Sequence, residues 1–364
     1  MKRNGIYSGI FLFVLIVLGW NLRANPKKQG FLLTQKNTEH YALQLAIQES
    51  IQYLQKLPSD SKFLIQGETY TPLEILHPLK LLQKQIESKK EKEILTEVRR
   101  HFKEVELKSN SEFPLITGYY EVQIQGRTKP NGKYLYPALI PPKQNSNQIN
   151  SKSYPREFWK LESNWKSVSH PIVYLTLTDL HLAQLEGSAL VQTETKEIFR
   201  INYAADNGLD YLSPANHLTG VCPSLKPYHL SKCWETNPLE VSEAIWKNPR
   251  YIFFLKENLP KKYQSNLSFG PLGSGGIRLI AERSVAMDKQ IPLGFPVLVN
   301  FQSTKQKYDD HLVFVHDRGN AIQGEGRLDF YLGNETGIDD VANHLSTKGK
   351  VVLLVPKKQS PTLK

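Results

Sequence analysis

Cysteine is scarce in this sequence, and the patterns that mark metal or nucleotide sites are missing from it. Only two cysteines occur among the 364 residues, which excludes a scaffold of many disulfides and a zinc protein built on several cysteines. The ten histidines are scattered, without His-Glu-x-x-His or another metal-ligand spacing. No P-loop is present, and no Gly-x-Gly-x-x-Gly opens a helix after a strand. We therefore expect a protein that works without a metal ion or other cofactor.

Acidic residues are outnumbered by basic ones, at 35 Asp+Glu against 46 Lys+Arg, which leaves a formal charge of +11. Such a balance favours an anionic partner: a nucleic acid, an acidic membrane face or an acidic polymer such as a cell wall. The length suggests two domains, or one domain with a helical extension. The hydrophobic content of 40% is ordinary for a chain with a real core, which excludes a mainly disordered protein.

Long hydrophobic runs are absent apart from one, which lies within residues 1–24. Lys2 and Arg3 precede its uncharged stretch, Arg23 ends it, and Ala24 is a small residue where a signal peptidase can cut. Because the stretch is close to the roughly 20 residues that span a membrane, a cleaved signal peptide and an uncleaved N-terminal anchor both fit. Either one predicts export to the periplasm or cell envelope. No cysteine follows the run, which argues against a lipid-anchored N-terminus.

Apolar spacing predicts helices in the first hundred residues and β-strands after them. Three sets of apolar residues share a helix face: Leu43, Ile47, Ile51 and Leu54; Leu79, Leu82 and Ile86; Ile94, Val98 and Phe102. Short β-type runs follow, broken by Gly, Pro and Asn: ITGYYEVQIQ, HPIVYLTL, RINYAA, FPVLVNF, HLVFVHD and KVVLLVP. Many short strands at irregular spacing favour a barrel or sandwich over a doubly wound sheet.

Three aspartates in the C-terminal third are the best candidates for chemistry. Asp288, Asp317 and Asp329 each lie beside an apolar strand and a glycine turn, where poor hydration is expected to raise the pKa of a carboxyl group. A single aspartate beside glycine is usually a turn cap. Three of them, each joined to a predicted strand, favour a site. No further acidic residue or histidine stands at ligand spacing, so we do not expect a divalent metal.

The aspartates belong to a series of ordered motifs. These are TGYYE (117–121), NPRYIFF (248–254), GPLGSGG (270–276), ERSVAMDKQIPLG (282–294), DRGNAIQG (317–324) and DFYLG (329–333). The series resembles the membrane-bound lytic murein transglycosylase A family, with its C-terminal "3D" domain named for three aspartates, over about residues 113–356. One departure is Glu186, which stands where the family usually has glutamine in FxQxQGSG. A second is the segment 220–234, which has no clear counterpart.

The resemblance implies a mainly β protein with N-terminal helices, in which a double-psi β-barrel carries a second, inserted β-rich domain and a groove lies between the two. We place the helical region and the first part of the barrel at residues 31–125 and the inserted domain at 126–238. The rest of the barrel follows at 239–356, with the 3D domain from about residue 270.

The resemblance also implies an activity. The family cleaves the β-1,4 bond between N-acetylmuramic acid and N-acetylglucosamine of peptidoglycan without water, and leaves a 1,6-anhydro end. The implied partners are glycan strands and other cell-wall enzymes rather than nucleic acid, with membrane association through the N-terminus. The sugar supplies its own nucleophile, so one carboxyl group can act as acid and then as base. By position this is Asp329, with Asp317 as the second catalytic aspartate.

Five further residues are predicted to bind substrate, each with a structural alternative. Asp288 is more often a turn cap in such a position. Tyr119 and Tyr120 alternate across a predicted strand, so only one faces the groove, and packing in the core explains them equally well. Gln184 and Glu186 share a face of a predicted strand, where a plain surface role is the alternative.

Two other functions remain open, and one disulfide is expected. A wall-binding double-psi module would hold glycan without cleaving it. A conventional glycoside hydrolase would need a second carboxylate, for which Glu186 or Glu325 is available. Cys222 and Cys233 are expected to pair, because export places them in an oxidising compartment, although two separate buried thiols are the alternative.

Overall fold

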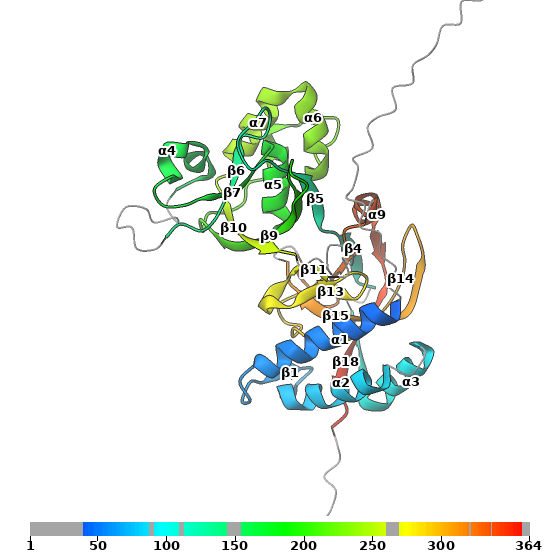
Figure 1. The fold of residues 1–364 in the computed structure, drawn as a ribbon. Coiled ribbons are helices and arrows are strands. Elements are labelled where there is room, and N and C mark those ends of the chain that lie inside the picture. The colour runs from blue at the N-terminus through cyan, green and yellow to red at the C-terminus, as the bar shows by residue number, and fades with distance from the viewer. Residues whose placement is uncertain are drawn as a thin grey trace, which may run out of the picture.

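The computed structural model describes residues 39–86, 91–108, 113–143, 154–259, 269–319, 322–335 and 337–358. The predicted export segment, residues 1–24, lies outside these ranges, as do Asn320 and Ala321 of the DRGNAIQG motif. Within the described part of the chain, no helix is long and apolar enough to cross a membrane. Figure 1 shows three layers: helices α1–α3 on one side, a large central sheet, and a smaller sheet with its own helices on the other side.

The predicted N-terminal helices are confirmed. They are α1 (Glu39–Lys56), α2 (Pro72–Ile86) and α3 (Glu91–His101), and a short hairpin of β1 (Phe63–Ile65) and β2 (Glu68–Tyr70) joins the first two. Their apolar faces are buried in the largest core, against the central sheet. The prediction that Phe102 continues the third helix is wrong. Phe102 begins strand β3, because its backbone pairs with Pro356 at the far end of the chain.

Eight strands form the central sheet, in the order β17-β4-β16-β13-β15-β14-β18-β3. Their bounds are β3 (Phe102–Leu107), β4 (Leu115–Tyr119), β13 (Ser284–Met287), β14 (Pro296–Gln302), β15 (Lys307–Asp317), β16 (Leu328–Tyr331), β17 (Ser346–Lys348) and β18 (Lys350–Pro356). The pairs β13–β15 and β4–β16 are parallel, and the others are antiparallel. These pairings do not by themselves form a closed barrel.

A second sheet of four strands has the order β10-β9-β8-β5. Its strands are β5 (Val122–Gln125), β8 (Ser188–Gln192), β9 (Ile198–Asp206) and β10 (Ile252–Asn258). Around it lie the hairpin of β6 (Tyr136–Leu139) and β7 (Pro171–Leu175) and helices α4 (Glu162–Trp165), α5 (Leu177–Glu186), α6 (Leu230–Thr236) and α7 (Pro238–Lys247). A disulfide joins Cys222 to Cys233 within a small separate core, which confirms the predicted pairing. The hairpin of β11 (Phe269–Leu272) and β12 (Arg278–Ile280) follows, and α9 (Ile338–His344) precedes β17.

The architecture is therefore mixed α/β with several sheets, rather than mainly β. The predicted run ITGYYEVQIQ is in fact two strands of different sheets, β4 and β5, with Tyr120 and Glu121 between them. The prediction that Gln184 and Glu186 lie on a strand is also wrong, because both belong to helix α5. Thr176 caps that helix by accepting a hydrogen bond from the Asp179 backbone N–H (3.1 Å), and Gly187 ends it in the left-handed conformation.

Candidate active site

Asp329 lies in the middle of the central sheet, on β16 between β4 and β13. Thr117, its parallel neighbour on β4, donates a hydrogen bond from Oγ1 to Oδ1 of Asp329 (2.7 Å). Arg327 donates to the same Thr117 oxygen (2.9 Å), which directs the threonine proton toward the carboxyl group. Burial raises the pKa of Asp329, and the Thr117 hydrogen bond and the Arg327 charge offset this rise only in part. A raised pKa favours the protonated carboxyl, the form that a general acid needs.

Asp317 ends strand β15 and is held by a glycine-rich loop. Its Oδ1 accepts hydrogen bonds from the backbone N–H (3.0 Å) and the hydroxyl (2.9 Å) of Ser274, and its Oδ2 accepts one from Tyr119 (3.4 Å). Burial raises the pKa of Asp317 against the effect of these donors. A Cβ on Gly273 would lie 2.6 Å from the carbonyl oxygen of His316, so only glycine lets the loop approach so closely.

The two aspartates and Tyr119 belong to one electrostatic unit. The negative charge of Asp317 raises the pKa of Asp329 further. Burial, followed by the charges of both carboxylates, raises the pKa of Tyr119 well above its usual value, so its hydroxyl stays protonated and donates. The Tyr119 ring packs on Tyr331, with 5.1 Å between ring centroids. The structure thus brings together three residues that the motifs singled out.

Glu186, on a helix beside the second sheet, interacts electrostatically with Asp329. It is the last residue of α5, and its side chain is exposed to solvent. Desolvation by the surrounding protein and the negative charge of Asp329 nevertheless raise its pKa to about 7. Glu186 also acts on Tyr120. Desolvation raises the pKa of Tyr120, and the negative charge of Glu186 raises it further. A carboxyl group of the inserted part therefore interacts electrostatically with Asp329 of the central sheet.

Gln184 does not accompany Glu186, since residues two apart on a helix point in different directions. Its side chain is buried and donates a hydrogen bond from Nε2 to the carbonyl oxygen of Ile252 (2.9 Å). That contact joins helix α5 to strand β10 of the four-stranded sheet. The capping residues Thr176 and Gly187 were the signals in the sequence that predict a helix here.

Asp288 differs from the other two aspartates, and the prediction that its pKa is raised is wrong. Oδ1 accepts from the backbone N–H of Gln290 (2.9 Å), and Oδ2 accepts from that of Gly324 (2.8 Å). These donors stabilise the carboxylate and lower the pKa of Asp288. The residue thus joins the motif that begins at Glu282 to the motif that begins at Asp317.

Glu325 and the grouping of acidic residues bear on a second catalytic carboxylate and on a metal site. Glu325, the other carboxylate considered as a partner, is exposed in the turn before β16. Among the described residues, no group of three or more His, Cys, Asp or Glu side chains could hold a metal ion.

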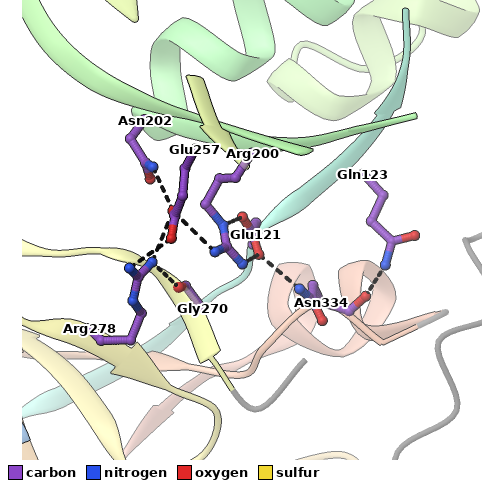
Figure 2. A network of polar contacts seen from close by, with 8 residues as sticks. All are labelled: Glu121, Gln123, Arg200, Asn202, Glu257, Gly270, Arg278 and Asn334. Atoms are coloured by element: carbon purple, nitrogen blue, oxygen red, sulfur yellow. Dashed lines mark hydrogen bonds and ion pairs between the residues drawn. The ribbon is translucent and has the colours of Figure 1, made fainter. Parts of the chain in front are cut away.

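The sequence did not point to a network of charged side chains beside the site, two of them fully buried (Figure 2). Glu121, Arg200, Glu257 and Arg278 alternate in it as carboxylate and guanidinium. Glu121 lies in the motif TGYYE and Arg200 in the predicted strand RINYAA, but neither segment indicates a partner for its charge. The pairing was not predictable, because the partners are far apart in the sequence and meet only after both sheets have formed.

Two family models match the sequence. The model of the MltA specific insert domain matches residues 115–255, and that of the 3D domain matches residues 283–355. The first match contains β4, the four-stranded sheet and its helices, and the second contains Asp288, Asp317 and Asp329.

One curated relative and several solved structures are similar to the chain. Membrane-bound lytic murein transglycosylase A of Vibrio cholerae is 27% identical over 255 residues, or 65% of this chain, and the match spans 64% of that relative's length. The crystal structure of MltA from Neisseria gonorrhoeae superposes with a TM-score of 0.67 at 20% identity and covers 89% of this chain and 90% of that one. E. coli MltA with bound chitohexaose gives a TM-score of 0.64 at 19% identity, over 87% and 90% of the two chains. The fold is therefore the mixed α/β MltA fold, and the chain is a homologue of a lytic transglycosylase, an enzyme.

Proposed function

We propose that this chain, which belongs to the membrane-bound lytic murein transglycosylase A (MltA) family, cleaves the β-1,4 bond between N-acetylmuramic acid and N-acetylglucosamine in peptidoglycan and leaves a 1,6-anhydro end. One observation carries the proposal. The Asp329 carboxyl accepts a hydrogen bond from Thr117 and interacts electrostatically with Asp317, and desolvation raises its pKa. Such a group is protonated at a higher pH than an exposed aspartate and can donate its proton to a glycosidic oxygen.

The reaction needs one carboxyl group in two successive roles. Protonated Asp329 gives its proton to the glycosidic oxygen while the bond from that oxygen to C1 of the muramic acid breaks. The Asp329 carboxylate then takes the proton from the 6-hydroxyl of the same sugar while O6 bonds to C1. The proton returns to the carboxyl group, and no water is consumed. Because the nucleophile is part of the substrate, its effective concentration is high and a second catalytic carboxylate is not required.

Asp317 and the two tyrosines would position the sugar rings. The hydrogen bonds from Ser274 hold Asp317 in one place, and Tyr119 connects it to the strand that carries Thr117. Aromatic rings such as those of Tyr119 and Tyr120 suit the apolar faces of sugars.

We place the glycan strand between the two sheets. Glu186 lies on the surface at the end of α5 and interacts electrostatically with Asp329 of β16, so a glycan strand that contacts both carboxyl groups would lie there. The bound chitohexaose in the E. coli relative is consistent with a groove that takes an extended oligosaccharide. The inserted domain, at residues 126–238 by our boundaries, would form one wall together with β5 and β10 of the same sheet, and the rest of the segments 31–125 and 239–356 would form the other.

We also propose that the central sheet closes into a double-psi barrel. Strands β17 and β18 are separated only by Gly349, and they pair with β4 and β14, respectively. Treated as one strand, they would connect the two ends of a six-stranded ring. The backbone N–H of Gly349 donates to the carbonyl oxygen of Pro114 (3.1 Å), which keeps this strand beside the entry to β4.

The cell envelope is the compartment that suits this activity. Residues 1–24 would export the chain as a signal peptide or hold it at a membrane, and the Vibrio relative is named membrane-bound. The net charge of +11 suits a polymer whose peptide stems carry carboxylates. Other enzymes of the cell wall would be its protein partners.

A hydrolase with two carboxylates is the second candidate, and a specific observation favours it. Glu186 has a pKa of about 7 and interacts with Asp329, which resembles the pairing of a base with an acid. A conventional hydrolase would use Glu186 to activate water.

Mass spectrometry of purified murein after digestion separates the candidates. A transglycosylase releases fragments with 1,6-anhydro ends, and a hydrolase releases fragments with reducing ends that are heavier by one water. A binding module retains murein in a pull-down and releases nothing. Asp329→Asn is the matched control, and activity that survives in it belongs to another group or to a contaminant.

A further inference from the structure

The chain crosses between the two sheets twice, and the charge network lies at both crossings (Figure 2). The first crossing is at Tyr120 and Glu121, between β4 and β5. The second follows β10, which carries Glu257, and leads to the hairpin that carries Arg278. Arg200, on β9 of the smaller sheet, contacts the carboxylates at both crossings.

The network is compact and its formal charges cancel. Arg200 donates to Glu121 through Nε and through Nη2 (3.0 Å), and its Nη1 lies 3.4 Å from Oε2 of Glu257. Arg278 completes the chain of charges with two contacts to Glu257, at 2.8 and 3.0 Å. The side chains of Glu121 and Arg200 have no solvent exposure. Desolvation largely offsets the attraction within such a pair, so what it provides is one defined arrangement rather than a large gain in stability.

One end of the network reaches the strand that carries Asp329. The backbone N–H of Glu121 donates to the carbonyl oxygen of Gly333 (2.9 Å), and Asn334 donates to Oε2 of Glu121 (2.8 Å). Both residues follow directly after β16. Glu121 also follows two residues after Tyr119, which donates to Asp317.

The other end reaches the helix that carries Glu186. Asn202 donates to Oε2 of Glu257 (2.9 Å), and its backbone pairs with Ser188 at the start of β8. Ser188 lies two residues after Glu186. The network therefore has short connections to the acidic residues on both sides.

We propose that Glu121, Arg200 and Glu257 are positioning residues, which hold the smaller sheet so that Glu186 and Asp329 face the same glycan strand. The inference rests on the proposed function, because it assumes one substrate in contact with both sheets. A break in the network would let the sheets sit in several relative positions. Catalysis would fall because an oriented substrate contributes much of the rate.

The test uses the full chain with Glu121 changed to glutamine, which keeps the shape of the side chain and removes its charge. Spin labels at the exposed positions Glu240, on helix α7 beside the smaller sheet, and Lys305, between β14 and β15 of the central sheet, report the distance between the two sheets by double electron–electron resonance. We expect one narrow distance distribution in the labelled protein with the intact network and a broader one in labelled Glu121→Gln. The kcat/KM of Glu121→Gln on murein should fall by about tenfold or more.

Asp206→Asn is the matched control. It removes an ion pair of 2.6 Å with Arg250, which joins the end of β9 to the residues before β10 within the smaller sheet, so we expect the narrow distribution and an unchanged kcat/KM. A narrow distribution and an unchanged kcat/KM in Glu121→Gln would overturn the inference.

If Glu121→Gln does not fold, Glu257→Gln takes its place, because the Glu257 side chain keeps 27% exposure and tolerates the change more easily. An unchanged distance distribution in that variant would overturn the inference equally. The distance measurement needs no turnover. A wild-type chain that leaves murein intact would therefore refute the proposed function, while the labels would still report on the network.

Discussion

Replacement of Glu186 by glutamine is the sharpest test of how the site works. The resemblance drawn from the sequence implies that glutamine is usual at this position. A protonated Glu186 presents the same neutral donor and acceptor to a sugar as a glutamine amide. With a pKa of about 7, the side chain is largely protonated in mildly acidic solution. We therefore expect Glu186→Gln to retain murein cleavage at pH 5.5.

The cleavage rates of the wild type and of Glu186→Gln should diverge as the pH rises through 7. Ionised Glu186 can no longer donate a hydrogen bond to the sugar. Its negative charge also disfavours the carboxylate form of Asp329, which must take the proton from the 6-hydroxyl. One pH unit above its pKa, about nine-tenths of Glu186 is ionised. If only the neutral form is competent, the variant should exceed the wild type by up to about tenfold at pH 8.

The assay is the initial rate of release of anhydro fragments from purified murein between pH 5 and 8.5. The ratio of variant to wild type at each pH isolates the titration of Glu186, because Asp329 titrates in both proteins. Glu162→Gln removes a carboxylate from an exposed pair on α4 and serves as the control for a change in net charge.

A loss of more than about a hundredfold in Glu186→Gln at every pH would refute this reasoning, because a loss of that size is typical of removing a general acid or base. It would make Glu186 a second catalytic carboxylate and favour the hydrolase. A ratio that stays at one up to pH 8.5 would show that the ionisation of Glu186 does not matter to catalysis.

Four other outcomes follow from the structure. Asp329→Asn should lower murein cleavage by about 10²–10⁴-fold with an unchanged circular dichroism spectrum, and retention of more than about a tenth of the rate would indicate another acid. Asp317→Ala should reduce turnover because the Ser274 and Tyr119 contacts are lost, whereas unchanged rate and affinity would leave it a loop anchor. Reduction of Cys222–Cys233 should lower the free energy of unfolding by about 2–3 kcal/mol and leave the cleavage rate unchanged, and the denatured, unreduced protein should titrate no free thiol. Burial lowers the pKa of His316 to about 3, so its contribution to stability is full above pH 6.5 and is lost as the pH falls toward 3, by up to about 1.4 kcal/mol per unit. Urea unfolding at several pH values checks this. His316→Gln should reduce the slope of the profile over that window without abolishing it, because burial also lowers the pKa of His181 and His311 to about 3.

Local pattern was enough to predict several features of this protein. The runs FPVLVNF, HLVFVHD and KVVLLVP are strands β14, β15 and β18, because short apolar runs between turn residues suit buried strands. The motifs also singled out Asp329 and Asp317, and the structure places the two in electrostatic contact with each other and with Tyr119. The Cys222–Cys233 disulfide could also be predicted from the sequence, because the two cysteines are only 11 residues apart in one segment.

Only the tertiary structure decided how each acidic residue behaves. Asp329 obtains its hydrogen bond from Thr117, which is 212 residues away, because β4 and β16 pair in parallel. Asp288 has the same sequence context as the other two aspartates, yet two backbone N–H groups lower its pKa, one of them from the distant Gly324. Glu186 interacts electrostatically with Asp329 only because the tertiary structure brings the end of α5 near β16. A pKa depends on the burial, donors and charges that distant segments supply, and the spacing of residues along a chain carries no record of them.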